Sequence, residues 1–250
     1  MNLALVLGGG AARGAFHLGV LHYCEVNNIE IHAFSGSSIG SIISCSHASG
    51  INAKEQLKIF SSKEIKEIFK FNYFKSGLLK IDSSKEIIKE LLPISKIQDI
   101  PKPVFVNAYD LKKRELHYFN SGDTITLCMA SSAIVPLFKP IKYNNMNLID
   151  GGLFDNIPIK PLENKNYDIL CVDLFPKKYA NKILKINPIK ILKRKLFTQL
   201  YENNKYSLKH TDYYIGSSKI REFALYSFEE LQDCFNLGVK EAKNHFLDII

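Results

Sequence analysis

Gly36-Ser37-Ser38-Ile39-Gly40 follows the apolar run Ile31–Phe34 and precedes a second apolar run of small residues, Ser41–Ala48. This order predicts a strand, a tight turn that carries Ser38 and then a helix, which is the context that a nucleophile elbow requires. A serine at the tip of so sharp a turn has strained backbone, and Gly36 and Gly40 must therefore lack a Cβ atom. The helix behind Ser38 would direct its N-terminus at a developing oxyanion.

A glycine-rich turn follows the first apolar run of the chain. Leu3–Leu7 leads directly into Gly8-Gly9-Gly10-Ala11-Ala12-Arg13-Gly14, and a helical pattern comes next. Turns of this kind expose consecutive N–H groups and bind anions, so nucleotide binding is one interpretation. The spacing excludes it, because a Rossmann motif needs glycine where Arg13 stands and a P-loop needs lysine where Ala15 stands.

The same turn fits an oxyanion hole. We expect the N–H groups of Gly8, Gly9 and Gly10 to stabilise the negative charge of a tetrahedral intermediate. Arg13 would either brace this loop or contact an anionic substrate.

A third segment ends in a carboxylate. Asn147–Asp150 is a short, mostly apolar strand pattern that runs into Gly151 and Gly152. An aspartate in such a position can face a cleft and act as a base. Asp-Gly-Gly is also a plain turn signal, so both interpretations stay open on this segment alone.

In this order, the three segments resemble the patatin-like phospholipase family. The similarity covers roughly residues 3–175, and further segments contribute to it: Gly77–Leu79, Val104–Asp110, Glu115–Gly122, Ala130–Pro140 and Asp150–Pro158. Gly14, Gly36, Gly40, Gly151 and Gly152 stand at motif glycines. Two residues depart from the pattern. Ala11 stands where many members have glycine, and Ile39 stands where a small residue is commoner, which bears on the shape of the acyl pocket.

The resemblance implies a serine lipid acyl hydrolase of the phospholipase A or lysophospholipase type. Ser38 would attack the ester carbonyl and form an acyl-enzyme, with Asp150 as the only base and no cofactor. An aspartate is a weak base, so it must lie close to Ser38 in a poorly solvated site. We see no metal-ligand spacing and expect neither a metal nor a calcium requirement.

A serine–acid–histidine triad is the competing mechanism. Chain order leaves only His210 and His245 downstream of Asp150, and both have the surroundings of surface residues. His17 lies in the first helix, where packing is the simpler role. Asp155 is a second candidate carboxylate, although the following Asn-Ile-Pro suggests that it caps a turn.

The hydrophobic pattern predicts an α/β fold, a three-layer α/β/α sandwich with a largely parallel central sheet. The expected strands are Leu3–Leu7, Ile31–Phe34, Val104–Ala108, Met146–Ile149 and Ile169–Asp173, with Glu115–Phe119 at an edge. The expected helices are Ala15–Asn27, Ser41–Ala48, Ala53–Phe60, Lys63–Phe69, Ser84–Leu92, Thr124–Ser131, Ile189–Tyr201 and Phe228–Phe246. Capping boxes are predicted at Ser83/Glu86 and Ser227/Glu230.

Length and composition fit one domain over residues 1–250. The chain has 250 residues, of which 46% are hydrophobic, and its five cysteines form no C-x-x-C pair. We interpret these cysteines as reduced core residues of a cytoplasmic protein. The N-terminal run is too short and too glycine-broken for a signal peptide, and no apolar run approaches the ~20 residues that span a bilayer. Any membrane contact would be peripheral, at the inner face.

The net charge of +8 is concentrated in one segment. Residues 177–209 hold ten Lys or Arg and a single acid, so this segment carries the whole basic excess. Lys190, Lys193, Arg194 and Lys195 alternate there with apolar residues, which suits the surface of an anionic bilayer. A solvated face over a packed helix is equally compatible, and nucleic-acid binding lacks a recognition motif.

Two further points stay open. Phe69–Leu79 is the most aromatic stretch, and it is either a lid over the cleft or a loop that packs on the core. The activity could also be that of a soluble carboxylesterase or acyl-thioesterase, or the chain could be a catalytically silent membrane-binding module. The oligomeric state does not follow from the sequence.

Overall fold

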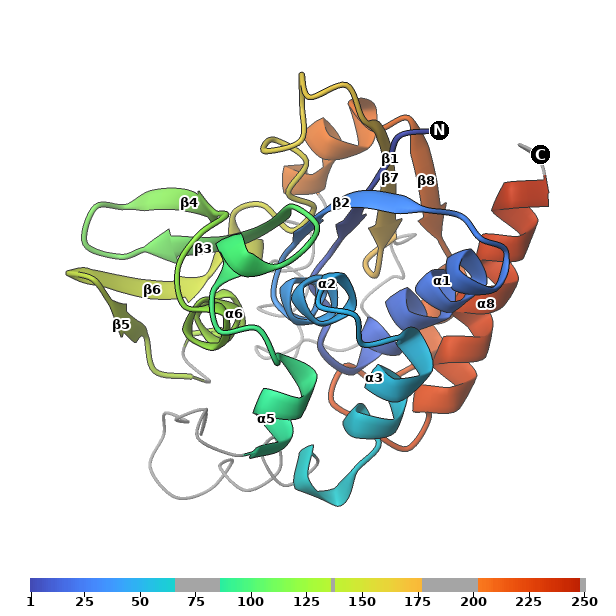
Figure 1. Ribbon diagram of the computed structural model, residues 1–250, viewed down its shortest axis with the longest axis horizontal. Coiled ribbons are helices and arrows are strands. Elements are labelled where there is room, and N and C mark those ends of the chain that lie inside the picture. Colours follow the sequence, from blue (N-terminus) through green and yellow to red (C-terminus); the bar gives the residue numbers. More distant parts are fainter. Residues whose placement is uncertain (66–85, 136–137, 177–201, 248–250) are drawn as a thin grey trace, which may run out of the picture.

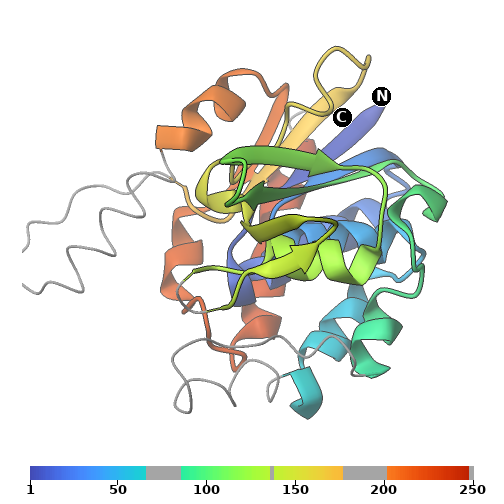
Figure 2. The ribbon, with the colours of Figure 1, turned by 90° about the vertical axis from the view of Figure 1, so that its left-hand side faces the viewer.

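A mostly parallel sheet forms the centre of the molecule in the computed structural model (Figure 1), which describes residues 1–65, 86–135, 138–176 and 202–247. The strands are β1 (Leu3–Leu7), β2 (Ile31–Gly36), β3 (Val104–Asp110), β4 (Glu115–Phe119), β5 (Ile141–Tyr143), β6 (Met146–Asp150), β7 (Asp168–Asp173) and β8 (Tyr213–Gly216). Their order is β5-β6-β3-β2-β1-β7-β8, and β4 also pairs with β3. The pairs from β3 to β8 along this order are parallel, whereas β4, β5 and β6 form antiparallel pairs at the end that Figure 2 faces.

The central strands are apolar on both faces because both faces are covered. In β1, Leu3, Leu5 and Leu7 join the larger core, and Ala4 and Val6 join a smaller core on the opposite face. The α/β fold with a largely parallel central sheet is therefore confirmed.

The larger core lies beneath most of the helices. These are α1 (Gly14–Val26), α2 (Ile39–Ala48), α3 (Ala53–Phe60), α5 (Glu86–Leu91), α6 (Thr124–Ser131) and α8 (Leu231–Leu247). Helices α1 and α8 lie side by side (Figure 1) and approach closely at Gly19 and Gly238. A Cβ atom on Gly19 would lie 2.1 Å from the Phe235 carbonyl oxygen, so only glycine permits this contact.

The smaller core is covered by the chain around Ile157–Leu162 and by a helix at 202–209. Leu208 packs against this core, and the Ser207 hydroxyl donates to the Ile157 carbonyl at 2.6 Å. Within the described residues the third layer is therefore thinner than the first.

Most of the expected elements are present with ends that differ by one to three residues. Glu115–Phe119, Ala53–Phe60 and Thr124–Ser131 have the predicted bounds. The sequence did not predict β5, β8 or the helix at 202–209. The capping box at Ser227 is wrong, because α8 begins at Leu231 and the Ser227 hydroxyl accepts from the Glu229 N–H instead.

Several expectations lie outside the described residues. They are the aromatic stretch Phe69–Leu79, the capping residue Ser83, the helix Ile189–Tyr201, most of Lys63–Phe69, and the four basic residues Lys190, Lys193, Arg194 and Lys195. Along the part of the chain that is described, no helix is both long and apolar enough to cross a bilayer.

Candidate active site

Ser38 lies at the turn between β2 and α2 in the strained backbone of an elbow. Its φ of 53° and ψ of −124° are in a region that residues with side chains rarely adopt. A Cβ atom on Gly36 would lie 2.4 Å from the Gly40 carbonyl oxygen, and one on Gly40 would lie 2.0 Å from that of Leu7. Both glycines are therefore required by close backbone contact, as the sequence predicts.

A network of buried hydrogen bonds holds the backbone of the elbow in place. The Ser38 N–H donates to the Ser131 hydroxyl at 2.8 Å, and that hydroxyl lies 3.4 Å from Asn107 Oδ1. The Asn107 amide in turn donates to the Asp155 carbonyl at 2.6 Å. Ser131 and Asn107 are fully buried, so these bonds replace hydration that both residues lose on folding.

Asp150 ends β6 and reaches Ser38. Asp150 is only 3% exposed, its Oδ1 accepts the Gly152 N–H at 2.7 Å, and the Ser38 side chain lies close enough to stabilise its charged form. Burial raises the pKa of Asp150 to about 7, and the hydrogen bonds from Gly152 and Ser38 oppose that shift. The structure thus brings together the two residues that the sequence selected from distant segments.

The glycine loop passes beside Ser38, but its N–H groups are not all available. A Cβ atom on Gly9 would lie 3.1 Å from the Ser38 Cβ. The Gly8 N–H donates to the Val172 carbonyl at 3.2 Å, and the Gly9 N–H donates to Asn156 Oδ1 at 3.1 Å. This differs from the expectation that Gly8, Gly9 and Gly10 all serve an oxyanion, because two of them hold the loop in place.

Unlike those of Gly8 and Gly9, three N–H groups around the elbow are available to bind an oxyanion. Among the described residues, those of Gly10, Ala11 and Ile39 have no hydrogen-bond partner. Ala11 and Ile39 also line the same pocket as Ser38. Ala11 has a φ of 50°, in the left-handed region that favours glycine, which gives a physical reason for glycine at this position in similar sequences.

Arg13 and His17 brace this loop. The Arg13 guanidinium donates to the Phe223 carbonyl at 2.9 Å and to those of Leu174 and Arg221 at 3.4 Å. Arg13 is therefore placed as a brace and not at the oxyanion position. His17 Nε2 lies 2.7 Å from the Gly8 carbonyl oxygen, and burial lowers the pKa of His17 to about 4, so the neutral ring donates this bond.

The other candidate bases lie in different surroundings. His210 stacks on Tyr206, and its Nδ1 lies 2.8 Å from the Tyr206 carbonyl. His245 packs edge-on against Tyr213. The Asp155 carboxylate accepts the Tyr118 hydroxyl at 2.6 Å, and burial raises the pKa of Asp155 to about 6. The structure assigns none of these three side chains a contact with Ser38.

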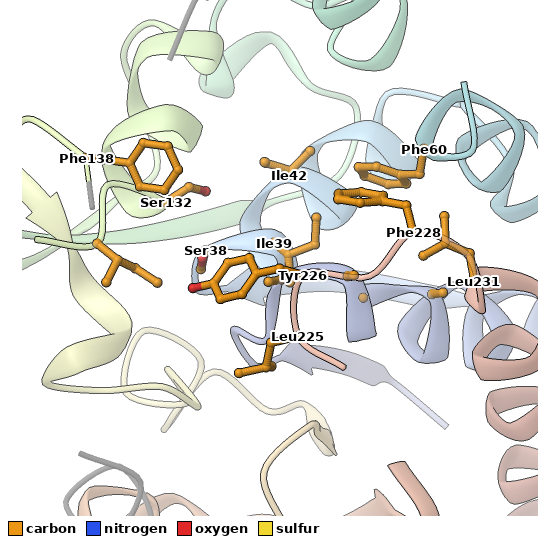
Figure 3. Close-up of a pocket in the computed structure, with 15 residues that line it drawn as sticks. Ser38, Ile39, Ile42, Phe60, Ser132, Phe138, Leu225, Tyr226, Phe228 and Leu231 are labelled. Carbon is orange, nitrogen blue, oxygen red and sulfur yellow. The ribbon is translucent and has the colours of Figure 1, made fainter. Parts of the chain in front are cut away.

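An apolar pocket opens beside Ser38 (Figure 3). Hydrocarbon groups dominate its walls, which come from α1, α2, α3, the end of α6 and the residues before α8. The lining residues are Ala11, Ala12, Gly14, Ala15, Ser38, Ile39, Ile42, Phe60, Ser132, Ile134, Phe138, Leu225, Tyr226, Phe228 and Leu231. Such a pocket suits a hydrocarbon chain whose reactive end lies at Ser38.

The described residues contain no group of three or more His, Cys, Asp or Glu side chains arranged to hold a metal ion. All five cysteines are buried and free of disulfides, although the sulfur atoms of Cys45 and Cys128 lie 3.6 Å apart.

Comparison with known proteins places this sequence in a family. Residues 5–163 match the family described as Patatin-like phospholipase, and this segment contains the glycine loop, Ser38 and Asp150. The chain belongs to the patatin-like phospholipase family. Lipid hydrolysis is the activity associated with that family.

Curated relatives match about two thirds of this patatin-like chain. An uncharacterised NTE family protein of Mycobacterium bovis is 27% identical over 170 residues, which cover 67% of this chain and 47% of the relative. A lysophospholipase, NTE1 of Cryptococcus neoformans, is 31% identical over 184 residues, which cover 69% of this chain and 11% of the relative. The chain therefore spans less than half the length of either protein.

Solved structures share the fold. VipD from Legionella pneumophila has a TM-score of 0.57 and 12% identity, and the match covers 99% of this chain and 67% of VipD. The type III effector protein ExoU has a TM-score of 0.50 and 15% identity, over 99% of this chain and 53% of ExoU. At these identities the likeness shows the fold alone.

Sequence reasoning missed the residues that support the patatin-like site. Asn107 and Asn156 connect it to the sheet and to the glycine loop, and neither was assigned a role in the site. Asn107 carried a usable signal, since an amide inside the otherwise apolar strand Val104–Ala108 must find buried partners. Asn156 stands in the Asn-Ile-Pro after Asp155, which was interpreted only as part of a turn, and its partner Gly9 lies in a remote part of the chain.

Proposed function

We propose that this protein hydrolyses fatty-acyl esters of membrane phospholipids or lysophospholipids, with Ser38 as the nucleophile and Asp150 as the base. One observation carries the proposal: an elbow serine that lines an apolar pocket lies beside a buried carboxylate. Membership of the patatin-like phospholipase family supports it, as does a fungal relative named lysophospholipase.

The reaction would proceed through an acyl-enzyme. Ser38 Oγ attacks the ester carbonyl carbon while its proton passes to Asp150, and the electron pair of the C=O double bond moves to the oxygen. The available N–H groups of Gly10, Ala11 and Ile39 would stabilise this oxyanion. Collapse of the intermediate breaks the bond to the alcohol, which takes the proton from Asp150.

Water then releases the fatty acid. Asp150 accepts a proton from the attacking water, the second tetrahedral intermediate collapses, and the proton returns to Ser38 Oγ. A pKa of about 7 makes Asp150 a stronger base than an exposed aspartate and leaves it partly ionised at neutral pH. Burial of the carboxylate therefore supports base catalysis without a histidine.

We further propose that the protein acts in the cytoplasm, as a single domain that binds peripherally to the inner face of the membrane. Five buried free thiols are compatible with a reducing compartment. The basic residues Lys190, Lys193, Arg194 and Lys195 would contact anionic lipid. In support of one domain, β8 pairs with β7 and α8 packs on α1.

The direct test measures fatty acids released from mixed phospholipid vesicles by mass spectrometry. Wild type and His210→Gln should release fatty acid, whereas Ser38→Ala and Asp150→Asn should reduce release by about a thousandfold or more. Full activity of Ser38→Ala, or loss of activity in His210→Gln alone, would contradict the proposed roles.

Neutralising the basic segment distinguishes an enzyme that acts on membrane lipid from a soluble esterase or thioesterase. Replacing Lys190, Lys193, Arg194 and Lys195 with Gln should lower hydrolysis of anionic vesicles about tenfold or more while sparing a soluble ester. Equal activity on vesicles before and after this change would argue for a soluble ester as the substrate.

A further inference from the structure

The pocket extends to both sides of Ser38. Figure 3 shows Ser132 and Phe138 on one side of Ser38, and Phe60, Phe228 and Leu231 together at the far end of the other side. Ile39 and Ile42 lie between Ser38 and this far end. A chain bound to Ser38 that extends toward the far end would therefore meet two aromatic rings and a leucine.

Helix α2 provides the wall along which such a chain would run. Ser38 precedes its first turn, and Ile39 and Ile42 are three residues apart, so they share one face of the helix. The Ile39 side chain packs closely against Gly14, since a Cβ atom on Gly14 would lie 2.5 Å from Ile39 Cγ1. Both isoleucines are less than 10% exposed, so this wall is fixed by packing.

The residues at the far end of the pocket belong to the larger core or pack against it. Phe60 is the last residue of α3 and is 7% exposed, and Leu231 is the first residue of α8 and is 5% exposed. Phe228 is half-buried in the preceding segment and packs against the same core. Because close-packed interiors yield little, this end resists entry of additional methylene groups.

On the basis of the proposed function, we propose that Phe60, Phe228 and Leu231 form a wall that sets the longest fatty-acyl chain this protein accepts. The occupant is the straight acyl chain of the ester, because the pocket is continuous with the nucleophile and is lined by hydrocarbon. Chains that end before the wall bind fully, and longer chains must leave part of their length in water. The bulk of Ile39 and Ile42 narrows the same passage.

The test is a chain-length profile measured with p-nitrophenyl esters from butanoate to stearate. Phe228→Ala should move the optimum of kcat/KM to longer chains by about two methylene groups, with about a tenfold relative gain for the longest good substrates. Ile42→Phe should fill the passage and move the optimum to shorter chains. Phe228→Leu is the conservative variant, with a smaller shift in the same direction as Phe228→Ala.

Phe223→Ala is the matched control. Phe223 is also half-buried and packs against the same core, but it does not line the pocket. It should leave the chain-length profile unchanged. Profiles of Phe228→Ala and Phe228→Leu that superimpose on wild type, or an equal shift in Phe223→Ala, would overturn the wall while Ser38-dependent hydrolysis stays intact. Hydrolysis that survives in Ser38→Ala would instead overturn the proposed function itself.

Discussion

Asp150 lies in an environment very different from that of its free amino acid. Burial raises its pKa to about 7, and only the ionised form can accept the Ser38 proton. We expect kcat/KM for an uncharged ester to rise about tenfold per pH unit below about pH 7 and to level off above it. A pH–rate profile between about pH 5 and 9 measures this. If kcat/KM instead rises only up to about pH 4 and is constant above it, Asp150 keeps its ordinary pKa.

The same burial lowers stability at high pH. The folded pKa of Asp150 lies above the unfolded value of about 3.9, so the stability that the protonated carboxyl provides is complete below about pH 4 and lost as the pH rises through about 7. Asp150→Asn cannot ionise and keeps an acceptor for Gly152. Its free energy of unfolding should be roughly 1–4 kcal/mol higher than that of wild type near pH 8, although we expect it to be inactive.

Urea titrations at two pH values test this expectation. The gain should shrink as the pH approaches about 4, where neither form carries a buried charge. A variant less stable than wild type at about pH 8 would mean that the ionised carboxylate is held by more hydrogen bonds than Gly152 and Ser38 supply.

At this scale the sequence predicted that Ser38 and Asp150 lie together, but not the residues that support them. Ser38 and Asp150 stand in recognisable local patterns, so they could be selected before the fold was known. The roles of Gly8, Gly9 and Arg13 depend on partners such as Asn156, Val172 and Phe223, which only the fold brings near. The local sequence therefore predicts the loop, but it does not predict which N–H groups of the loop stay free of hydrogen bonds.

Asn156 links two elements of the site, the glycine loop and the turn after β6. Its Oδ1 accepts the Gly9 N–H at 3.1 Å. A Cβ atom on Gly152 would lie 2.9 Å from Asn156 Oδ1 and 3.0 Å from Asp150 Oδ1, so the two oxygens are close neighbours. Asn156→Ala should release the loop and lower kcat about 10–100-fold with little change in KM.

Asn156→Asp separates the link from the charge. It keeps an acceptor for Gly9 but adds a negative charge beside Asp150, so the pKa in the activity profile should move up. Steady-state kinetics against pH for both variants measures the two effects. Wild-type kcat in Asn156→Ala would show that the loop needs no such link.

Helix α2 and strand β1 meet at Gly40 with no room for a side chain. Gly40→Ala would place a Cβ atom 2.0 Å from the Leu7 carbonyl oxygen and should lower the free energy of unfolding by about 4 kcal/mol or more. Gly50 has a φ of +97° and open space around it, so Gly50→Ala should cost only about 1–2 kcal/mol of backbone strain. Denaturant unfolding of the pair makes the comparison, and equal losses would contradict a close contact at Gly40.

The elements that the sequence predicted best are those with local signals. Helix α6 begins after Asp123, whose side chain accepts the Thr126 N–H, and its bounds were correct. Strand β8 and the helix at 202–209 were missed because Tyr213–Gly216 is short and the helix lies in a polar, basic stretch. Both are stabilised by the sheet, β8 through pairing with β7 and the helix through Leu208.

Over the whole molecule, the site is assembled from parts that are far apart in sequence. Strand order places the ends of β1, β2 and β6 near one another, which the order of motifs along the chain does not specify. The residues before α8 complete the pocket: the Ala12 N–H donates to the Leu225 carbonyl at 2.9 Å, and Leu225 and Tyr226 line the cavity. The sequence indicated only a basic, helical C-terminal part and not this contribution.

In the proposed mechanism Ser38 is nucleophilic in the intact fold, and Asp150 alone activates it. Intact-mass measurement after exposure to a fluorophosphonate tests both points, because the serine oxygen attacks phosphorus, fluoride leaves and the adduct remains. We expect one adduct, at Ser38, that forms at equal rates in wild type and His210→Gln, is absent in Ser38→Ala and forms at least about a hundredfold more slowly in Asp150→Asn. An adduct at another residue, or labelling of Asp150→Asn at the wild-type rate, would contradict it.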